Sequence, residues 1–250
     1  MRKEGGRIEI IYNLCKNSKT NKVNVSVLAK ELGVSEATIR RDLNALAKQG
    51  KLSKVHGGAM LLGGEFHGEE LDMETKRGLF TQEKDRAARY AAGLIGDDDV
   101  VFLDAGTTVL RMAEHLRASK ALFLTNSIEC ACRLMERNLR THVLGGMLKA
   151  GTMALIGAET LAALRRYNFT KAFLGANGVT IAQGFTTPDP EEAAVKALAA
   201  ERAQEVYVLA DSSKFGQVTA AVIFPIEAAC IITDRLPDRQ YRDYTDVREV

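Results

Sequence analysis

Near the N-terminus, hydrophobic residues recur at helical spacing in three successive segments, which predicts three short helices. The second segment contains Val27, Leu28 and Leu32 and stops at Gly33, because glycine readily takes the left-handed conformation at a helix end. Ser35 is then the predicted N-cap of the third helix. The inward positions of the first and third helices are Ile8, Ile11, Tyr12, Cys15, Ile39, Leu43 and Leu46. A helix, a tight turn and a second amphipathic helix are typical of a helix-turn-helix motif.

A short basic segment after the third helix has the pattern of a two-stranded hairpin, or wing. Leu52 and Val55 are its apolar positions, and glycines bracket the basic residues around them. A wing of this kind directs basic side chains at DNA phosphates, although a turn histidine is an equally open interpretation of His56. The whole arrangement predicts a winged helix-turn-helix DNA-binding domain over residues 1–58. If Arg40 and Arg41 were considered without the neighbouring elements, an ordinary surface helix with solvated arginines would be the alternative. The candidate DNA contacts are Ser35, Glu36, Thr38, Arg40, Arg41, Asn44, Lys54 and His56.

Charge distinguishes the two parts of the chain. Residues 1–58 contain 12 Lys and Arg against 5 Asp and Glu, a net charge of +7, whereas the whole chain carries only +2. The remainder of the chain therefore carries a negative net charge. A basic module joined to a mildly acidic body is typical of a nucleic-acid-binding domain attached to a domain that avoids nucleic acid. We therefore expect double-stranded DNA as a partner.

Length and composition allow one small and one larger domain. The chain has 250 residues, 46% of them hydrophobic. Residues 59–80 lack periodicity, which predicts a linker, so the larger domain is expected over residues 81–250. The sequence has no apolar run of membrane-spanning length and no apolar signal core, so we expect a cytoplasmic protein without membrane contact. The four cysteines lack metal-ligand spacing and are expected to be reduced thiols, with no metal and no cofactor.

From residue 81 onward, strand-like apolar runs alternate with helical periodicity, which predicts an α/β fold with a mainly parallel sheet. Strands are predicted at 100–104, 121–125, 141–145, 171–175, 206–210 and 228–233. Helices are predicted at 82–95, 108–117 and 127–138, and another opens within 184–196. Functional loops in such folds cluster at the carboxyl ends of the strands.

Glycines and small polar residues follow three of the predicted strands at their carboxyl ends. Such turns offer backbone N–H groups and hydroxyls to an anion, although a single turn often serves only to cap a helix. Lys214 follows a later strand and is the strongest candidate for a ligand contact, whereas Glu192 has stabilisation of a helix N-terminus as an open alternative. Three turns in succession predict a pocket for a phosphate or a polyol. Its candidate residues are Asp104, Gly106, Thr107, Thr108, Thr125, Asn126, Ser127, Gly146, Lys149, Asn177, Glu192 and Lys214.

The segment G-V-S-x-x-T-I-R-R-D-L, followed by a wing that ends in H-G-G-A, resembles the DeoR family of bacterial transcription regulators. The turns of the second half extend this resemblance over nearly the whole chain. The resemblance implies an effector domain related in fold to ribose-5-phosphate isomerase, whose G-A-D-x-x-D segment supplies two carboxylates for proton transfer. Here Asn177 and Thr180 occupy those two positions, while Glu192 and Lys214 are retained. The resemblance therefore implies a site that binds a sugar phosphate without turning it over.

These observations predict a ligand-controlled transcription regulator, a repressor of a carbohydrate catabolism operon that a phosphorylated sugar or sugar alcohol releases from operator DNA. A homo-oligomer, dimer or tetramer, is expected because a paired operator mirrors a two-fold axis. The alternative is a sugar-phosphate isomerase with an appended domain, which the lack of carboxylates at 177 and 180 disfavours. An architectural DNA binder is a third alternative, but it leaves the anion-binding turns unexplained. Activation at some promoters stays open.

Overall fold

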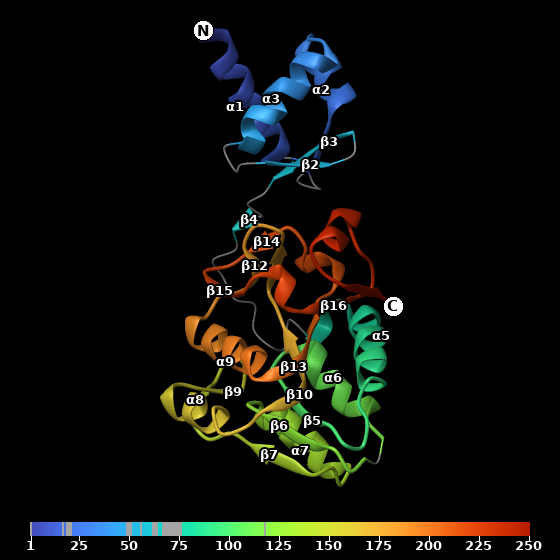
Figure 1. Ribbon diagram of the computed structural model, residues 1–250, viewed down its shortest axis with the longest axis vertical. Helices are drawn as coiled ribbons and strands as arrows, with labels where there is room; N and C mark the ends of the chain where they lie inside the picture. The colour runs from blue at the N-terminus through green and yellow to red at the C-terminus, as the bar shows by residue number, and fades with distance from the viewer. Residues whose placement is uncertain are drawn as a thin grey trace.

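Three helices and a three-stranded antiparallel sheet form a winged helix at the N-terminus of the computed structural model (Figure 1). The structure describes residues 2–16, 18, 22–48, 52–55, 57–61, 65–66, 77–117 and 119–250. The elements of the winged helix are α1 (Arg2–Lys16), β1 (Lys22–Asn24), α2 (Val25–Leu32), α3 (Glu36–Lys48), β2 (Leu52–Val55) and β3 (Gly58–Leu61). Strand β3 pairs with β1 on one side and with β2 on the other, which forms the predicted hairpin. Its second strand runs to Leu61, so the wing extends beyond the boundary predicted at residue 58, and residues 59–61 belong to a strand rather than to the predicted linker.

The core of the winged helix contains most of the apolar positions that the sequence pattern selects. Ile11, Leu28 and Ile39 are fully buried together, and Gly33 ends α2 with a φ of 63°. The prediction for Val27 is wrong, because its side chain is 59% exposed. Val25 takes the inward position instead, one helical turn before Leu28 on the same face.

Seven parallel strands form the central sheet of the larger domain, which confirms the predicted α/β class. Their order across the sheet is β17 (Val247–Glu249), β16 (Cys230–Thr233), β13 (Ala203–Leu209), β10 (Phe169–Gly175), β5 (Val100–Leu103), β6 (Leu122–Thr125) and β7 (Thr141–Val143). After β5, the chain places β6 and β7 on one side of β5, and it then returns to place β10 on the other side. The carboxyl ends of β5 and β10 therefore enclose the point where the strand order reverses, a usual location for ligand sites.

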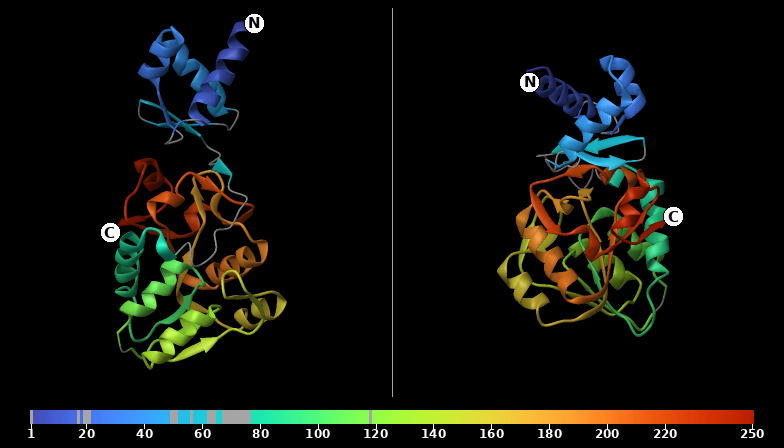
Figure 2. Two further views of the ribbon diagram at one scale, coloured as in Figure 1. Left: turned by 180° about the vertical axis from the view of Figure 1, so that it is seen from behind. Right: turned by 45° about the horizontal axis from the view of Figure 1, so that its top comes forward.

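Helices cover both faces of this sheet (Figures 1 and 2). Alternation along β5 shows the two faces, because Phe102 belongs to one core cluster while Val101 and Leu103 belong to the other. Helices α5 (Thr81–Ala92), α6 (Thr107–His115) and α7 (Ile128–Glu136) pack on the face of Val101. Helices α8 (Ala158–Leu164) and α9 (Pro190–Glu201) pack on the face of Phe102.

Several short strands lie outside the predictions made from the sequence. A second, antiparallel sheet contains β11 (Gly178–Thr180), β12 (Gly184–Thr187) and β15 (Ala221–Phe224). A hairpin joins β8 (Met147–Lys149) to β9 (Ala154–Ile156), and β4 (Glu65–Phe66) pairs with β14 (Gln217–Val218). The remaining elements are the 3-10 helices η1 (Ser212–Lys214), η2 (Ile226–Ala228) and η3 (Arg239–Asp243). Among the described residues, no helix has the length and apolar character needed to cross a membrane.

Candidate functional site

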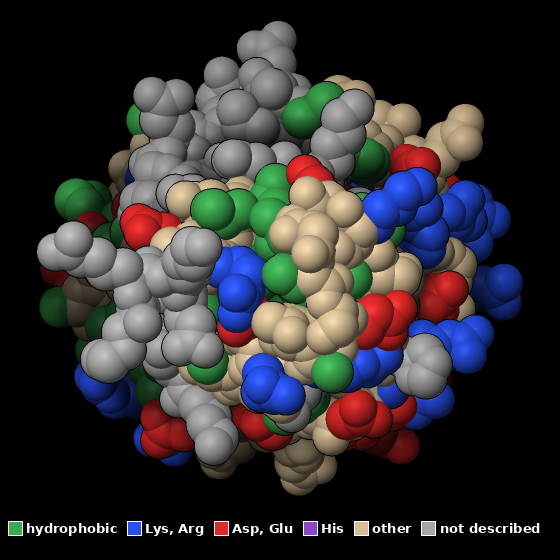
Figure 3. All heavy atoms as spheres, turned by 90° about the horizontal axis from the view of Figure 1, so that it is seen from above, with side chains coloured by type: hydrophobic (Ala, Val, Ile, Leu, Met, Phe, Trp, Pro, Cys, Tyr) green, Lys and Arg blue, Asp and Glu red, His purple; other side chains and the backbone are tan. Residues whose placement is uncertain are grey.

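Helix α3 presents a polar face to solvent in the winged helix. Arg40, Arg41 and Asn44 are exposed, while the opposite face of the helix is buried. Asp42 is directed inward and accepts a hydrogen bond from Arg7 Nε at 2.6 Å, which connects α3 to α1. Seen from the end of the molecule that carries this domain, Lys and Arg side chains form several exposed groups, with Asp and Glu among them (Figure 3). The exposed face of α3 has the composition of a recognition helix that contacts DNA bases.

Some of the predicted DNA contacts also stabilise α3 itself. The Ser35 hydroxyl accepts a hydrogen bond from the Thr38 backbone N–H at 3.3 Å, as expected for an N-cap. Glu36 forms an exposed ion pair with Arg40 at 3.2 Å. In the wing, the backbone of Lys54 belongs to β2. The DNA contacts predicted for the Lys54 side chain and for His56 lie outside the described residues.

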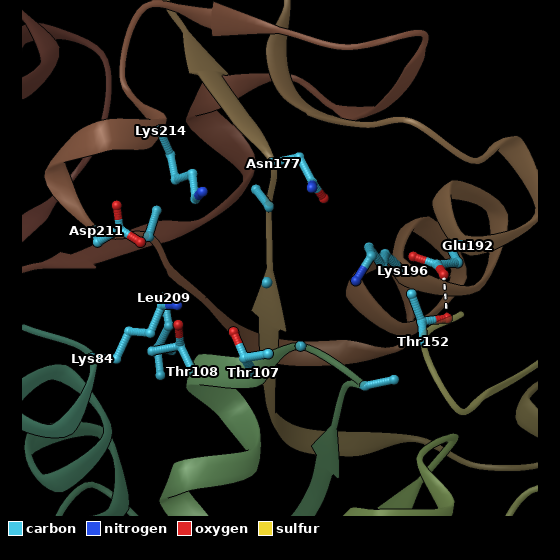
Figure 4. A pocket seen from close by; sticks show the side chains of 15 residues that line it. Lys84, Thr107, Thr108, Thr152, Asn177, Glu192, Lys196, Leu209, Asp211 and Lys214 are labelled. Carbon is cyan, nitrogen blue, oxygen red and sulfur yellow. Dashed lines mark hydrogen bonds between the residues drawn. The ribbon is translucent and has the colours of Figure 1, made fainter. Parts of the chain in front are cut away.

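An open cavity lies at the carboxyl ends of β5, β10 and β13 in the larger domain (Figure 4). Each of these strands supplies a turn to its lining. Six of the predicted pocket residues line it: Gly106, Thr107, Thr108, Asn177, Glu192 and Lys214. The cavity therefore lies at the carboxyl ends of the strands and next to the reversal point of the strand order, a feature that the sequence alone did not predict.

The N-terminus of α6 faces this cavity. Gly106 is its N-cap residue and provides no side chain, and Thr107 and Thr108 follow in the first turn. The first N–H groups of a helix lack partners within the helix and attract anions. Helix α7 differs, because the Ser127 hydroxyl accepts a hydrogen bond from the Cys130 N–H at 3.2 Å. The N-terminus of α6 therefore has backbone N–H groups without a side-chain cap that can bind an anion, whereas at the N-terminus of α7 the Ser127 hydroxyl caps such a group.

Two lysines, Lys84 from α5 and Lys214 from η1, lie on the same side of the cavity as Thr108 in the view of Figure 4. The ammonium of Lys214 has no hydrogen-bond or ion-pair partner in the part of the chain that the structure describes. Asp211 lies beside Lys214 but accepts hydrogen bonds from Ser213, whose backbone N–H is 3.1 Å away. This end of the cavity therefore suits a negatively charged group.

The opposite side of the cavity contains a buried ion pair. Lys196 donates a hydrogen bond to Asp104, and both residues are at least 95% buried. The same carboxylate accepts the Gly175 backbone N–H at 2.9 Å. Asp104, a predicted pocket residue, thus lies beneath the cavity and holds Lys196 at its wall, while connecting the turns after β5 and β10.

Glu192 lies in a second polar network on this side. Its carboxylate accepts hydrogen bonds from Thr152 Oγ1 at 2.7 Å and from Lys149 Nζ at 3.0 Å. Lys149 also forms an ion pair with Asp189 at 2.8 Å, behind the cavity wall. Burial raises the pKa of Asp189, but hydrogen bonds from Lys149 and from two backbone N–H groups outweigh it and hold the pKa below its ordinary value.

The structure does not bring four other predicted residues to the cavity. Thr125, Asn126 and Ser127 are buried, and the Thr125 hydroxyl donates to the Leu103 carbonyl at 2.6 Å. Gly146 has a φ of 137°, and a Cβ there would lie 2.0 Å from Thr160 Oγ1, so this glycine permits close packing. The hydroxyl groups of Thr125 and Ser127 thus form hydrogen bonds within the fold itself.

The predicted set omits four polar residues that line the cavity: Lys84, Thr152, Lys196 and Asp211. Lys84 and Lys196 lie inside helices, whereas the polar pattern that predicts the pocket lies mainly in turns at strand ends. A signal for Lys84 was present, because a lysine at an inward position of an otherwise alanine-rich helix face requires a polar environment. Thr152 lies in the β8–β9 hairpin, which the strand predictions did not include.

The cavity has the groups to bind an anion and hydroxyls, but it lacks a pair of adjacent carboxylates directed at a substrate. Asn177 lines it and accepts a hydrogen bond from Thr187 at 3.2 Å. Thr180 is buried away from it and bonds to Gln183 at 2.8 Å. Glu192 is the one carboxylate in the lining that faces Lys196 in Figure 4, and it already accepts two hydrogen bonds.

Comparison with known proteins identifies both parts of the chain. A model of the DeoR-like helix-turn-helix domain matches residues 7–63, and a model of the DeoR C terminal sensor domain matches residues 80–235. The chain is 38% identical over 229 residues to the uncharacterized HTH-type transcriptional regulator FruR of Bacillus subtilis (strain 168), covering 91% of this chain and 90% of that protein. It is 32% identical over 254 residues to the lactose phosphotransferase system repressor of Streptococcus mutans serotype c, covering 100% and 99%.

Solved structures match the chain at low similarity. Ribose 5-phosphate isomerase A of Methanocaldococcus jannaschii has a TM-score of 0.38 at 20% identity and covers 53% of each chain. The full-length sorbitol operon regulator SorC of Klebsiella pneumoniae has a TM-score of 0.41 at 10% identity and covers 91% of this chain and 96% of that one.

A DNA-binding winged helix joined to a sensor domain defines a transcriptional regulator rather than an enzyme. The chain belongs to the DeoR family of these regulators.

Proposed function

We propose that the protein represses a carbohydrate catabolism operon and that a phosphorylated sugar or sugar alcohol, bound in the cavity, releases it from operator DNA. The observation that carries this proposal is Lys214, whose ammonium faces the cavity without a partner among the described residues. The uncapped N-terminus of α6 and Lys84 line the same side. A phosphate at this end neutralises the charge of the half-buried Lys214 and accepts hydrogen bonds from backbone N–H groups.

The other end of the cavity suits the hydroxyl groups of a sugar. Glu192 accepts hydrogen bonds, and the Asn177 amide can donate them. A site that pairs with hydroxyl groups rejects a ligand that lacks them, because buried polar groups are then left without partners. Among the relatives, the lactose phosphotransferase system repressor bears the name of a sugar, which supports a carbohydrate effector.

The proposed control is a shift between two states of the oligomer. The effector favours a state in which the paired α3 helices no longer match the spacing of the operator half-sites. Linkage then requires operator DNA to weaken effector binding by the same factor. A dimer or tetramer in the cytoplasm is part of this proposal, since an operator with two half-sites needs an even number of winged helices.

A thermal-shift screen of the full-length protein tests the proposed ligand class. The probes are ribose 5-phosphate, fructose 6-phosphate, glucose 6-phosphate and glucitol 6-phosphate, each beside its unphosphorylated parent. A ligand at 100 times its Kd stabilises the folded state by about 2.7 kcal/mol. We therefore expect a Tm increase of roughly 5 °C for at least one phosphate and none for its parent.

A second measurement connects this binding to DNA. The protein itself selects a tight-binding duplex from random-sequence DNA, and fluorescence anisotropy then gives the Kd with and without the stabilising phosphate at fixed salt. We expect the Kd to increase at least tenfold. A phosphate that raises Tm but leaves the DNA affinity unchanged would contradict its role as the releasing effector.

A further inference from the structure

The lysine at the cavity and the strand that follows the wing are connected through a single short segment. Lys214 ends η1, and β14 begins three residues later at Gln217. Strand β14 pairs in parallel with β4, with Gln217 opposite Glu65 and Val218 opposite Phe66. Figure 1 shows β4 next to β14 at the end of the sensor domain nearest the winged helix.

Strand β14 is held firmly on its cavity side. The Gly216 N–H donates to the Val179 carbonyl at 2.9 Å, and the buried Phe215 ring packs edge-on against Tyr241 at 5.0 Å. A Cβ on Gly178 would lie 2.3 Å from the Gln217 carbonyl oxygen, so the two backbones are in direct contact there. Gly178 follows Asn177, which lines the cavity.

Two cavity residues, Asn177 and Lys214, are therefore coupled to β14 through close backbone contacts and very short connections. A displacement of either residue must move β14, because packed interiors transmit small shifts rather than absorb them. On its other side, β14 meets β4, and within the described residues this pairing contains two residues of each strand. A pairing of two residues forms few hydrogen bonds, so we expect it to open more readily than the packed contacts on the cavity side.

Strand β4 lies close to the wing in sequence. Strand β3 ends at Leu61 and β4 begins at Glu65, so only residues 62–64 separate them. The four Cα–Cα steps from Leu61 to Glu65 span at most about 14 Å. The position of β4 on the sensor domain therefore restricts where the wing and α3 can lie.

We propose that the β4–β14 pair is the joint that couples the cavity to the DNA-binding domain. An anion that binds Lys214 and Asn177 draws β14 toward the cavity and separates it from β4. The winged helix then loses the restriction that keeps it in the DNA-binding arrangement. This inference rests on the proposed function for the nature of the anion, but the joint itself can be tested without any effector.

The experiment locks the joint with a disulfide in the full-length chain. Phe66→Cys and Val218→Cys are introduced together, since the two positions are opposite in the strand register. Cys132→Ser removes the exposed native cysteine. The matched control combines Phe66→Cys with Val222→Cys, because Val222 is exposed on β15 and is not a partner of β4. Operator Kd is measured for the reduced and oxidised forms, alone and with each of the four sugar phosphates named above.

A second variant tests the joint in the absence of effector. Gly178→Ala in the Phe66→Cys and Val218→Cys background displaces Gln217, the register partner of Glu65, because a Cβ at Gly178 would lie 2.3 Å from the Gln217 carbonyl oxygen, and it therefore disturbs the register of β14 against β4. Gly151→Ala is the control, because a Cβ at Gly151 meets no atom within 4 Å. We expect Gly178→Ala to weaken operator binding at least tenfold when reduced and to recover to within about twofold when oxidised. A recovery on oxidation distinguishes a displaced joint from a misfolded domain.

The outcomes of these experiments distinguish a failure of the proposed β4–β14 joint from a failure of the proposed sugar-phosphate effector. We expect the oxidised lock without Gly178→Ala to retain its DNA affinity in the presence of the phosphate that releases the reduced form. If the same phosphate concentration releases the oxidised, fully cross-linked protein from DNA, the proposed role of the β4–β14 joint is wrong. The proposal is also wrong if the reduced Gly178→Ala variant binds DNA with wild-type affinity. If no phosphate releases the reduced protein but oxidation restores Gly178→Ala, the joint stands and the proposed effector class fails.

Discussion

Lys196 and Asp104 form an ion pair at the base of the cavity, and each is at least 95% buried. Lys196→Met would leave the Asp104 carboxylate buried with the Gly175 N–H as its remaining described partner. Removing one member of a buried pair costs about 3–5 kcal/mol of the free energy of unfolding. Urea unfolding of the full-length protein measures this loss for the sensor domain.

The double variant Lys196→Met with Asp104→Asn is the control for this prediction. It removes the unpaired charge, so we expect it to recover most of the stability that the single variant loses. A Lys196→Met variant as stable as the wild type would show that water or another group replaces the lysine.

Lys214→Met should abolish the response to effector and leave both stability and DNA binding unchanged. The ammonium has no partner among the described residues, so its removal breaks no described interaction. We expect the Tm increase caused by the active sugar phosphate to disappear and the operator Kd to stay within about twofold. Lys120→Met is the control, because Lys120 is exposed and does not line the cavity. Loss of DNA binding by the Lys214 variant would give this residue a structural role instead.

Much of the fold was predictable because it depends on patterns that are local in sequence. Helical spacing selected Ile11, Leu28 and Ile39, and all three are buried. The apolar runs gave all of the central strands except β17, although their ends differ by a few residues, as in the predicted strand 206–210 and the observed β13. The error at Val27 arose because a short helix has several apolar residues and only tertiary contacts decide which ones face inward.

The cavity was predictable only in part, because its composition depends on which elements meet in space. Turns at strand ends identified Gly106 and Lys214, since those turns converge in any parallel sheet. The turn at Ser127 has the same composition, but its hydroxyl caps α7. Lys196 reaches the cavity from the middle of a helix, and its relation to Asp104, 92 residues away, could not be derived from local spacing.

Arg41→Ala should weaken operator binding by roughly 1–3 kcal/mol if its guanidinium contacts a base edge. Arg41 is exposed on α3, and no ion pair to it occurs among the described residues. The measurement is the operator Kd by anisotropy at several salt concentrations, with Lys120→Ala as the control. An unchanged Kd would place Arg41 away from the DNA, whereas a loss equal for all sequences would indicate a phosphate contact.

Cys132 should react with iodoacetamide at pH 8 in the folded protein, while Cys130 should not. The two residues lie on opposite sides of α7, so Cys132 is exposed and Cys130 is fully buried. Burial raises the pKa of the Cys130 thiol to about 12, which leaves almost no reactive thiolate. Mass spectrometry of labelled peptides checks this, with protein unfolded in urea as the control in which both react. Equal labelling in the folded state would mean that α7 opens on the time scale of the reaction.

Asp99→Asn should destabilise the sensor domain at neutral pH and have a much smaller effect in acid. The Asp99 carboxylate accepts hydrogen bonds from Lys171 Nζ at 2.8 Å, Thr170 Oγ1 at 2.6 Å and the Gly96 N–H at 2.8 Å. Burial raises its pKa, but these three partners outweigh burial and hold the pKa below the ordinary value. Replacing a carboxylate that accepts charge-assisted hydrogen bonds costs roughly 1.5–3 kcal/mol.

The direction of the pH effect follows from this lowered pKa. The unfolded chain protonates Asp99 near its ordinary pKa of about 3.9, before the folded protein does, so protons favour unfolding below that pH. The stabilisation by Asp99 is complete above about pH 5 and is lost as pH falls through the lowered pKa of the folded state. Urea unfolding of the wild type and of Asp99→Asn at pH 7 and at successively lower pH measures the difference. A difference in unfolding free energy that stays constant down to pH 3 would show that the ionised carboxylate does not stabilise the fold.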